Sequence, residues 1–218
     1  MLSANFDFYI HKPRGNSMML ARMAFLLSVP TAMVMVAATI SSAPAEQHGQ
    51  AVAQPEDRQR SLQYFGRIAT VIEHPRCMNC HTSTDFPRQG DDGHPHIMQV
   101  RRGLHDSGTP ALQCNTCHQR ENSPSGVPGN EVWHLAPLRM AWEGLSTGDI
   151  CRSLTDPQKG GMSYEQLIHH MAEDKLVAWA WDPGVDLSGK PRSMPPVSHS
   201  DFGQLVRDWV ATGAACPS

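Results

Sequence analysis

The sequence predicts a mainly α-helical fold with long loops. Apolar residues recur at spacings of three and four in several segments, which is the period of an amphipathic helix. The alternation of apolar and polar residues that is typical of half-buried strands is nearly absent. Gly and Pro number 17 each among the 218 residues, and both favour turns and irregular connections.

The first 45 residues have the features of an export signal. Arg22 places a positive charge before the apolar stretch of residues 24–38, and Ala43-Pro44-Ala45 matches the small-x-small pattern of a cleavage site. We therefore expect residues 1–45 to be removed and the protein to be periplasmic. The alternative is an uncleaved membrane anchor, because the apolar stretch is near the shortest length that spans a bilayer.

The remaining chain is expected to form one compact unit. We assign residues 46–55 to a linker and residues 56–218 to a domain, a length that suits one domain or two small ones. Translation from Met18 or Met19 would shorten the leader without changing this assignment. The formal net charge of the chain is −3, and this acidic balance argues against a nucleic-acid partner.

The strongest helix signal lies before residue 75. Within residues 56–73, one helical face is formed by apolar residues at three-to-four spacing, namely Leu62, Phe65, Ala69 and Ile72. Pro75 disfavours helical geometry in the residue before it, so it is expected to end this helix.

The later helices are predicted mainly from their caps. Ser146 precedes the apolar residues of one helix, and Ser163 with Gln166 forms a capping box before another. A final helix is expected from about Ser200, with Gly213 as its stop.

Between these helices the chain is expected to be irregular. Residues 86–110 and 122–129 are rich in Gly and Pro and have no sustained periodicity, so both are predicted to be loops. Pro137 is expected to open a short helix that carries Met140 and Trp142.

Two five-residue stretches, Cys77-Met78-Asn79-Cys80-His81 and Cys114-Asn115-Thr116-Cys117-His118, share the pattern C-x-x-C-H. At this spacing two thiols reach the two vinyl groups of one haem, and the following His reaches the iron from the proximal side. The pattern predicts two covalent haems, attached through Cys77, Cys80, Cys114 and Cys117, with His81 and His118 as proximal ligands.

Other uses of these cysteines are possible in principle. Without the histidines, two C-x-x-C pairs could form a four-thiolate zinc site that stabilises a binding module. Because His follows both pairs and an export signal precedes them, covalent haem is the stronger interpretation. Continuous aliphatic runs are few after the leader, so the porphyrins are expected to supply the core, and haem-free protein is expected to be largely unfolded.

The two remaining cysteines, Cys151 and Cys216, are predicted to form a disulfide, since an exported protein folds in an oxidising compartment. Closing so long a loop contributes about 4 kcal/mol in the chain-entropy account. Two buried free thiols are the alternative.

The distal iron ligands are less directly encoded. His96 lies 15 residues after His81 and His134 lies 16 after His118, a near-repeat that suggests one imidazole closing each haem. Bis-His coordination is therefore the first choice. The rival ligands are Met140, His170 and Met194, and a thioether ligand would raise the reduction potential. Four arginines are available for haem propionates: Arg76, Arg88, Arg101 and Arg102.

A helix that enters C-x-x-C-H and a closing helix with a Trp after Met-Pro-Pro resemble the c-type cytochrome plan. Further motifs are His74-Pro75-Arg76-Cys77, Gly90-Asp91-Asp92-Gly93, Pro95-His96, Arg102-Gly103, Trp133-His134-Leu135-Ala136-Pro137, Met140-Ala141-Trp142-Glu143-Gly144 and Gly213-Ala214-Ala215-Cys216-Pro217. Together they resemble a family of small exported dihaem proteins labelled isoquinoline 1-oxidoreductase subunit. The resemblance covers nearly all of residues 60–217.

This resemblance implies a compact dihaem cytochrome c-like domain that serves a molybdenum hydroxylase. The hydroxylase itself carries molybdopterin and iron-sulfur centres, and this chain has no cysteines to spare for a cluster. The expected function is electron transfer from such a hydroxylase or dehydrogenase to an acceptor toward the respiratory chain, with no catalytic residue. The alternative is a peroxidase-like enzyme in which one iron lacks a sixth ligand.

Overall fold

The computed structural model describes residues 54–218. The predicted leader, its start and its cleavage site lie outside the described residues, as does most of the linker at residues 46–55. Within the described part, none of the helices has both the length and the apolar character needed to cross a bilayer.

Helix α1 spans Pro55–Ile72 and agrees within one residue with the helix predicted at residues 56–73. It starts with Pro55 at its first turn, where the missing N–H of proline costs nothing. Its buried face includes Phe65 and Ile68. Pro75 lies just beyond its end and opens the single turn α2, Pro75–Met78, which leads into the first C-x-x-C-H.

The other helices are α3 (Thr147–Thr155), α4 (Tyr164–Glu173), α5 (Lys175–Ala178) and α6 (His199–Ala211). The predicted caps at two of them are confirmed: Ser146 accepts from the Asp149 N–H, and Ser163 forms the full capping box with Gln166. Helix α6 is capped by Ser198, two residues before the predicted start. Beyond its end, Gly213 has a φ of 96°, which glycine adopts without steric cost.

The four strands are short. β1 (Arg88–Gln89) pairs with β2 (His94–Pro95), and β3 (Gly108–Thr109) pairs with β4 (Leu112–Gln113), each pair antiparallel. The region predicted as one loop at residues 86–110 therefore contains the first hairpin and half of the second. The short helix expected after Pro137 is a single 3₁₀ turn, Leu138–Met140. The fold is mainly α with little strand, as predicted.

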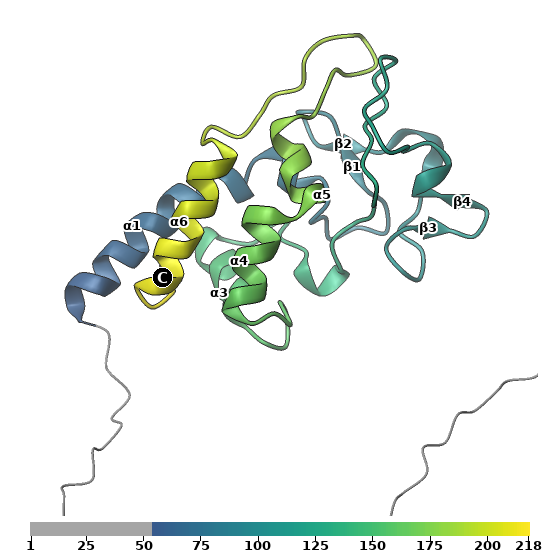
Figure 1. The fold of residues 1–218 in the computed structure, drawn as a ribbon. Coiled ribbons are helices and arrows are strands. Elements are labelled where there is room, and N and C mark those ends of the chain that lie inside the picture. The colour runs from purple at the N-terminus through teal and green to yellow at the C-terminus, as the bar shows by residue number, and fades with distance from the viewer. Residues whose placement is uncertain (1–53) are drawn as a thin grey trace, which may run out of the picture. The chain divides into compact units, whose positions relative to one another are not determined.

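The hydrophobic core lies among the helices. Helix α1 packs on α6, and α4 packs on the same helix, so α1, α4 and α6 lie side by side in Figure 1. Phe65 of α1 meets Trp209 of α6 with ring centroids 5.2 Å apart, and both side chains are fully buried. The expectation that porphyrins supply the core is therefore wrong for this part, because the apolar residues are concentrated on a few helix faces.

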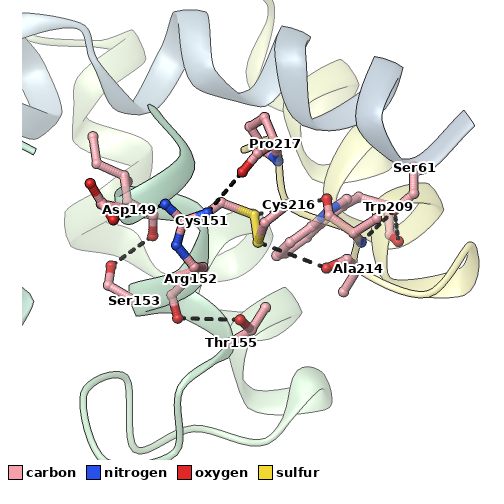
Figure 2. The surroundings of a disulfide bond; sticks show 12 residues. Ser61, Asp149, Cys151, Arg152, Ser153, Thr155, Trp209, Ala214, Cys216 and Pro217 are labelled. Carbon is pink, nitrogen blue, oxygen red and sulfur yellow. Dashed lines mark hydrogen bonds and ion pairs between the residues drawn. A yellow bond between two sulfur atoms is a disulfide. The ribbon is translucent and has the colours of Figure 1, made fainter. Parts of the chain in front are cut away.

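The predicted disulfide between Cys151 and Cys216 is present. It joins α3 to the segment after α6, as Figure 2 shows. In the same region Ser61 of α1 donates to the Trp209 carbonyl and accepts from the Ala215 N–H at 2.8 Å, while Arg152 donates to the Pro217 carbonyl at 2.8 Å. The C-terminal segment is thus fixed to both α1 and α3.

Candidate haem-binding site

Both C-x-x-C-H motifs fold into the same kind of helical turn. In the first, the N–H groups of Cys80 and His81 donate to the Cys77 carbonyl, each at 3.1 Å. In the second, the N–H groups of Cys117 and His118 donate to the Cys114 carbonyl, at 3.2 and 2.9 Å. The two motifs thus share one backbone turn from the first Cys to the His, and a regular local spacing of these residues is what thioether attachment and iron ligation require.

His81 is held in one tautomer and one orientation. Its Nδ1 lies 2.7 Å from the Met140 carbonyl oxygen, and since a carbonyl only accepts, Nδ1 carries the proton and Nε2 has the lone pair. The ring lies flat on Trp142, with centroids 3.4 Å apart and planes at 9°. Burial lowers the pKa of His81 to about 3, so the imidazole is neutral and available to a metal.

His118 repeats this arrangement. Its Nδ1 lies 2.8 Å from the Pro128 carbonyl oxygen, and its ring stacks on Trp133 with centroids 4.4 Å apart and planes at 8°. Burial lowers its pKa as well. Each motif thus carries a carbonyl-bonded imidazole against a tryptophan, with Nε2 left as the ligating nitrogen.

The four motif cysteines are free thiols, in contrast to Cys151 and Cys216. Burial raises the pKa of Cys77 to about 12 and that of Cys80 to about 11. Both side chains are therefore protonated thiols near neutral pH in this structure.

The first-choice distal residues, His96 and His134, share one local geometry. Each directs Nδ1 to the carbonyl of the next residue, Ile97 for His96 and Leu135 for His134, the latter at 2.8 Å. Both imidazoles are half-buried and line the same cavity. All four predicted imidazole ligands therefore have Nδ1 on a backbone carbonyl, a contact that commonly fixes ligand histidines.

The three rival ligands lie in different surroundings. Met140 is buried in the helical core, and its carbonyl accepts the hydrogen bond from Nδ1 of His81. Met194 is 57% exposed in the loop before α6. His170 is half-buried on α4, with Nδ1 3.8 Å from the Asp174 carboxylate. Burial lowers the pKa of His170, and nearby His134 lowers it further.

A cavity of about 590 Å³ connects the two motifs, within the range of about 300–1,000 Å³ found for cofactor-sized pockets. Its walls include Cys80 of the first motif and Cys114, Cys117 and His118 of the second. Apolar side chains such as Trp179 and Leu135 line it together with polar and charged ones. Apolar walls with thiols and an imidazole in one pocket fit a covalently attached porphyrin.

All four arginines expected near propionates line this cavity, and so does Arg192. Arg76 and Arg102 are buried and already paired: Arg76 with Asp91 and the Gly90 carbonyl, Arg102 with Asp106 and the Thr82 carbonyl. Burial lowers the pKa of Arg76. These guanidinium groups connect loops around the cavity, and their charges are offset by carboxylates, Asp91 and Asp106 among them.

Sequence reasoning did not identify Glu143 as part of the site. Its carboxylate accepts from the Thr82 hydroxyl, the Ser83 N–H and hydroxyl, and Arg88, at 2.6 to 3.1 Å. Burial alone would raise the pKa of Glu143, but the hydrogen bonds from Ser83 and Thr82 and the charge of Arg88 together lower it. It fixes the loop directly after His81.

Sequence reasoning also missed the stacking tryptophans, Trp133 and Trp142. A Trp directly before His134 and another inside the motif Met140-Ala141-Trp142-Glu143-Gly144 were the available signals. The supporting carbonyls of Met140 and Pro128 had no signal, because every residue has a carbonyl.

The zinc alternative has no geometric support. Within residues 54–218, no three Cys, His, Asp or Glu side chains gather in a way that could hold a metal ion. A four-thiolate site would need Cys77, Cys80, Cys114 and Cys117 to converge.

Comparison with known proteins found no matching family model, no similar curated protein and no similar solved structure.

Proposed function

We propose that this chain is an exported dihaem c-type cytochrome that carries electrons. The cysteines of the two motifs would hold the haems as thioethers, His81 and His118 would ligate the irons proximally, and His96 and His134 would supply the distal imidazoles. The observation that carries the proposal is the duplicated turn. Twice, C-x-x-C-H places an imidazole on a tryptophan with Nδ1 on a carbonyl.

The helices around the first motif support the same interpretation. Helix α1 enters the motif, and its Phe65 packs against Trp209 of the closing helix α6. This arrangement resembles the c-type cytochrome plan. It fixes the turn that carries Cys77, Cys80 and His81 to the buried helical core.

Bound haem supplies one-electron chemistry at iron. The chain supplies attachment, two imidazole ligands for each iron, and a largely apolar surrounding, which together set the reduction potentials. With two imidazoles as ligands of each iron, neither iron would have an open position for a substrate. Cys80 and Cys114 line one cavity, so the two cofactors would lie close enough for rapid electron exchange.

The proposed donor is a molybdenum hydroxylase or similar dehydrogenase, and the proposed acceptor leads to the respiratory chain. These partners rest on the family resemblance of the sequence. A chain with a formal charge of −3, which the haem propionates would make more negative, is suited to a partner with a basic docking surface.

The test is expression in the periplasm of a bacterium that matures c-type cytochromes. We expect a mass increase of two haems, a Soret band and low-spin ferric spectra for both irons. The variants Cys77→Ala/Cys80→Ala and Cys114→Ala/Cys117→Ala should each lose one haem. Purified molybdenum hydroxylase with its substrate should reduce the protein, and omitting the substrate is the control.

Colourless protein without added mass would refute the cytochrome assignment. A high-spin ferric signal together with peroxide turnover would instead support the peroxidase-like alternative. Two low-spin haems that a hydroxylase fails to reduce would leave the electron carrier intact and remove only the proposed donor.

A further inference from the structure

Across the cavity, the imidazole of His118 faces that of a residue that follows the first motif in sequence, His96. His96 follows the first motif, yet its ring centroid lies 6.1 Å from that of His118, with the ring planes at 66°. A metal–imidazole bond is about 2 Å long, so two imidazoles on opposite sides of one metal ion have centroids roughly 6 Å apart. The observed separation fits one iron between the two rings.

Direct edge-to-face packing of two aromatic rings covers the same range of distances. Two observations favour ligation over packing. Both rings place Nδ1 on a backbone carbonyl, Pro128 for His118 and Ile97 for His96, so in the neutral imidazole Nε2 is the nitrogen that carries the lone pair. Both rings also line the cavity that contains Cys114 and Cys117.

We propose that His96 is the distal ligand of the haem attached to the second motif. The iron of each haem would then take its distal imidazole from the segment that follows the other motif in sequence. This inference rests on the dihaem function proposed above. It differs from the pairing suggested by the sequence near-repeat, in which His96 would serve the haem of His81.

The hairpin of β1 and β2 is attached to the first motif. The Arg88 N–H donates to the Asn79 carbonyl within that motif at 3.1 Å. The His96 N–H donates to the Pro87 carbonyl at 2.9 Å, so His96 lies at the open end of the hairpin, next to Arg88. The backbone of His96 is therefore held beside the first motif, while its imidazole lies against that of His118 in the second.

Two residues shortly after His96 have a strained backbone conformation. A bond between the His96 imidazole and a metal ion would help to stabilise it. Met98 and Gln99 have φ values of 70° and 54°, in the left-handed region that non-glycine residues adopt only at a steric cost. Such strain persists where surrounding contacts over-determine the conformation, often at ligand-binding positions. Met98 is 71% exposed, so its own packing does not supply those contacts.

The segment of His134 is correspondingly attached to the first motif. The Ala136 N–H donates to the Cys80 carbonyl at 3.3 Å, and Arg102 donates to the carbonyls of both Thr82 and Ala136. These bonds draw the residues after His134 away from the second motif, although His134 follows that motif in sequence. His134 is therefore the matched control for His96.

The test uses a full chain that carries only the second haem, through Cys77→Ala/Cys80→Ala. In this background we expect His96→Ala to convert the ferric iron from low-spin to high-spin, with low-spin spectra restored by added imidazole. His134→Ala in the same background should stay low-spin. In the opposite background, Cys114→Ala/Cys117→Ala, the His96→Ala change should leave the iron low-spin.

Conversion by His134→Ala but not by His96→Ala would overturn the inference, and so would low-spin spectra in both variants. Should the single-haem backgrounds fail to fold, the two-haem protein gives a second measurement. There His96→Ala should make high-spin the haem that NMR assigns to the thioethers of Cys114 and Cys117, and His134→Ala should make the other haem high-spin. The opposite assignment would contradict the pairing. Protein without any haem would refute the proposed function and not the pairing alone.

Discussion

Two regions of this protein are stabilised in different ways. The helical half, residues 55–72, 147–173 and 199–216, contains most of the buried apolar side chains, among them Phe65 and Trp209, each fully buried. The loop half, residues 79–134, is described in full and contributes no side chain to the buried apolar core; its buried polar side chains are Thr82 and Arg102. Four of its large apolar side chains are exposed: Ile97, Met98, Leu104 and Val132.

The difference indicates which half would gain more stability from a bound cofactor. Apolar burial is the main force that offsets the conformational entropy lost on folding. The helical half has this burial and a disulfide, whereas the loop half has short hairpins, ion pairs and the wall of a large cavity. A porphyrin in that cavity would give the loop half the apolar surface that its own side chains lack.

The largest expected effect comes from removing both haems. In the variant with Cys77, Cys80, Cys114 and Cys117 all changed to Ala, we expect amide protection in α1, α4 and α6 to persist. Protection in residues 79–134 should fall by at least about tenfold relative to the haem-loaded protein, because local opening is cheapest where few apolar contacts are buried. Hydrogen exchange by mass spectrometry measures both halves in one sample.

Two outcomes would contradict the expected difference in haem dependence between the helical half and the loop half. Equal loss of protection everywhere would mean that the helices depend on haem, as composition alone suggested. Equal retention would mean that the loop half is stable without it. The haem-loaded wild-type chain is the reference in both cases.

The second effect tests the helical half alone. Cys151→Ala/Cys216→Ala opens a link with a sequence separation of 65 and should lower the free energy of unfolding by about 4 kcal/mol, because the unfolded chain gains freedom. Spectra of the folded, haem-loaded variant should be unchanged, since the disulfide lies among the helices. Denaturant titration gives the first quantity. A decrease in unfolding free energy below about 1 kcal/mol, or an altered Soret band, would contradict the view that the disulfide stabilises the helical half alone.

The fold was predictable where its signals are local. Pro55 and the apolar face of residues 56–73 determine α1, and the caps at Ser146 and Ser163 determine the starts of α3 and α4. The helical core was missed because composition averages over the chain. Averaging hides that the apolar residues are concentrated in the helices and the Gly and Pro residues in the loops.

The candidate site was predictable only in part. The C-x-x-C-H turns are contiguous in sequence, so their cysteines and histidines could be assigned from spacing. The approach of His96 to His118 is a tertiary contact created by the hairpin at residues 88–95. A repeat of 15 or 16 residues suggested one distal imidazole for each motif, but such a repeat does not specify which motif each imidazole faces.

A smaller effect is expected from Ser61, which connects α1 to the C-terminal segment. Ser61→Ala removes the acceptor of the Ala215 N–H and the donor to the Trp209 carbonyl. Leaving buried polar groups unpaired should cost about 1–2 kcal/mol of unfolding free energy. Gln63→Ala, at an exposed position of the same helix, is the control and should change stability by less than about 0.5 kcal/mol. Equal effects of the two variants would remove Ser61 from the contacts that stabilise the helical half.

The smallest effect concerns Glu143, which fixes the loop half to the segment before α3. Glu143→Gln should cost about 1 kcal/mol or less, because the carboxylate is partly exposed and its pairing with Arg88 is screened by water. The folded-state pKa of Glu143 lies below its ordinary value of 4.5, so its ionised form stabilises the fold above pH 4.5. That contribution is lost as the pH falls through the lowered pKa.

The difference in stability between wild type and Glu143→Gln should therefore be constant near neutral pH and vanish in acid, as denaturant midpoints across this range would show. Glu131→Gln is the matched control, because its carboxylate pairs with Lys175 on an exposed surface and the pair is more fully screened by salt. At moderate ionic strength the Glu131 difference should disappear before the Glu143 difference does. If salt reduces the stability differences of the two variants equally, the hydrogen bonds of Glu143 with Thr82, Ser83 and Arg88 contribute no more than an exposed ion pair. The stability of the loop half would then depend even more on what occupies its cavity.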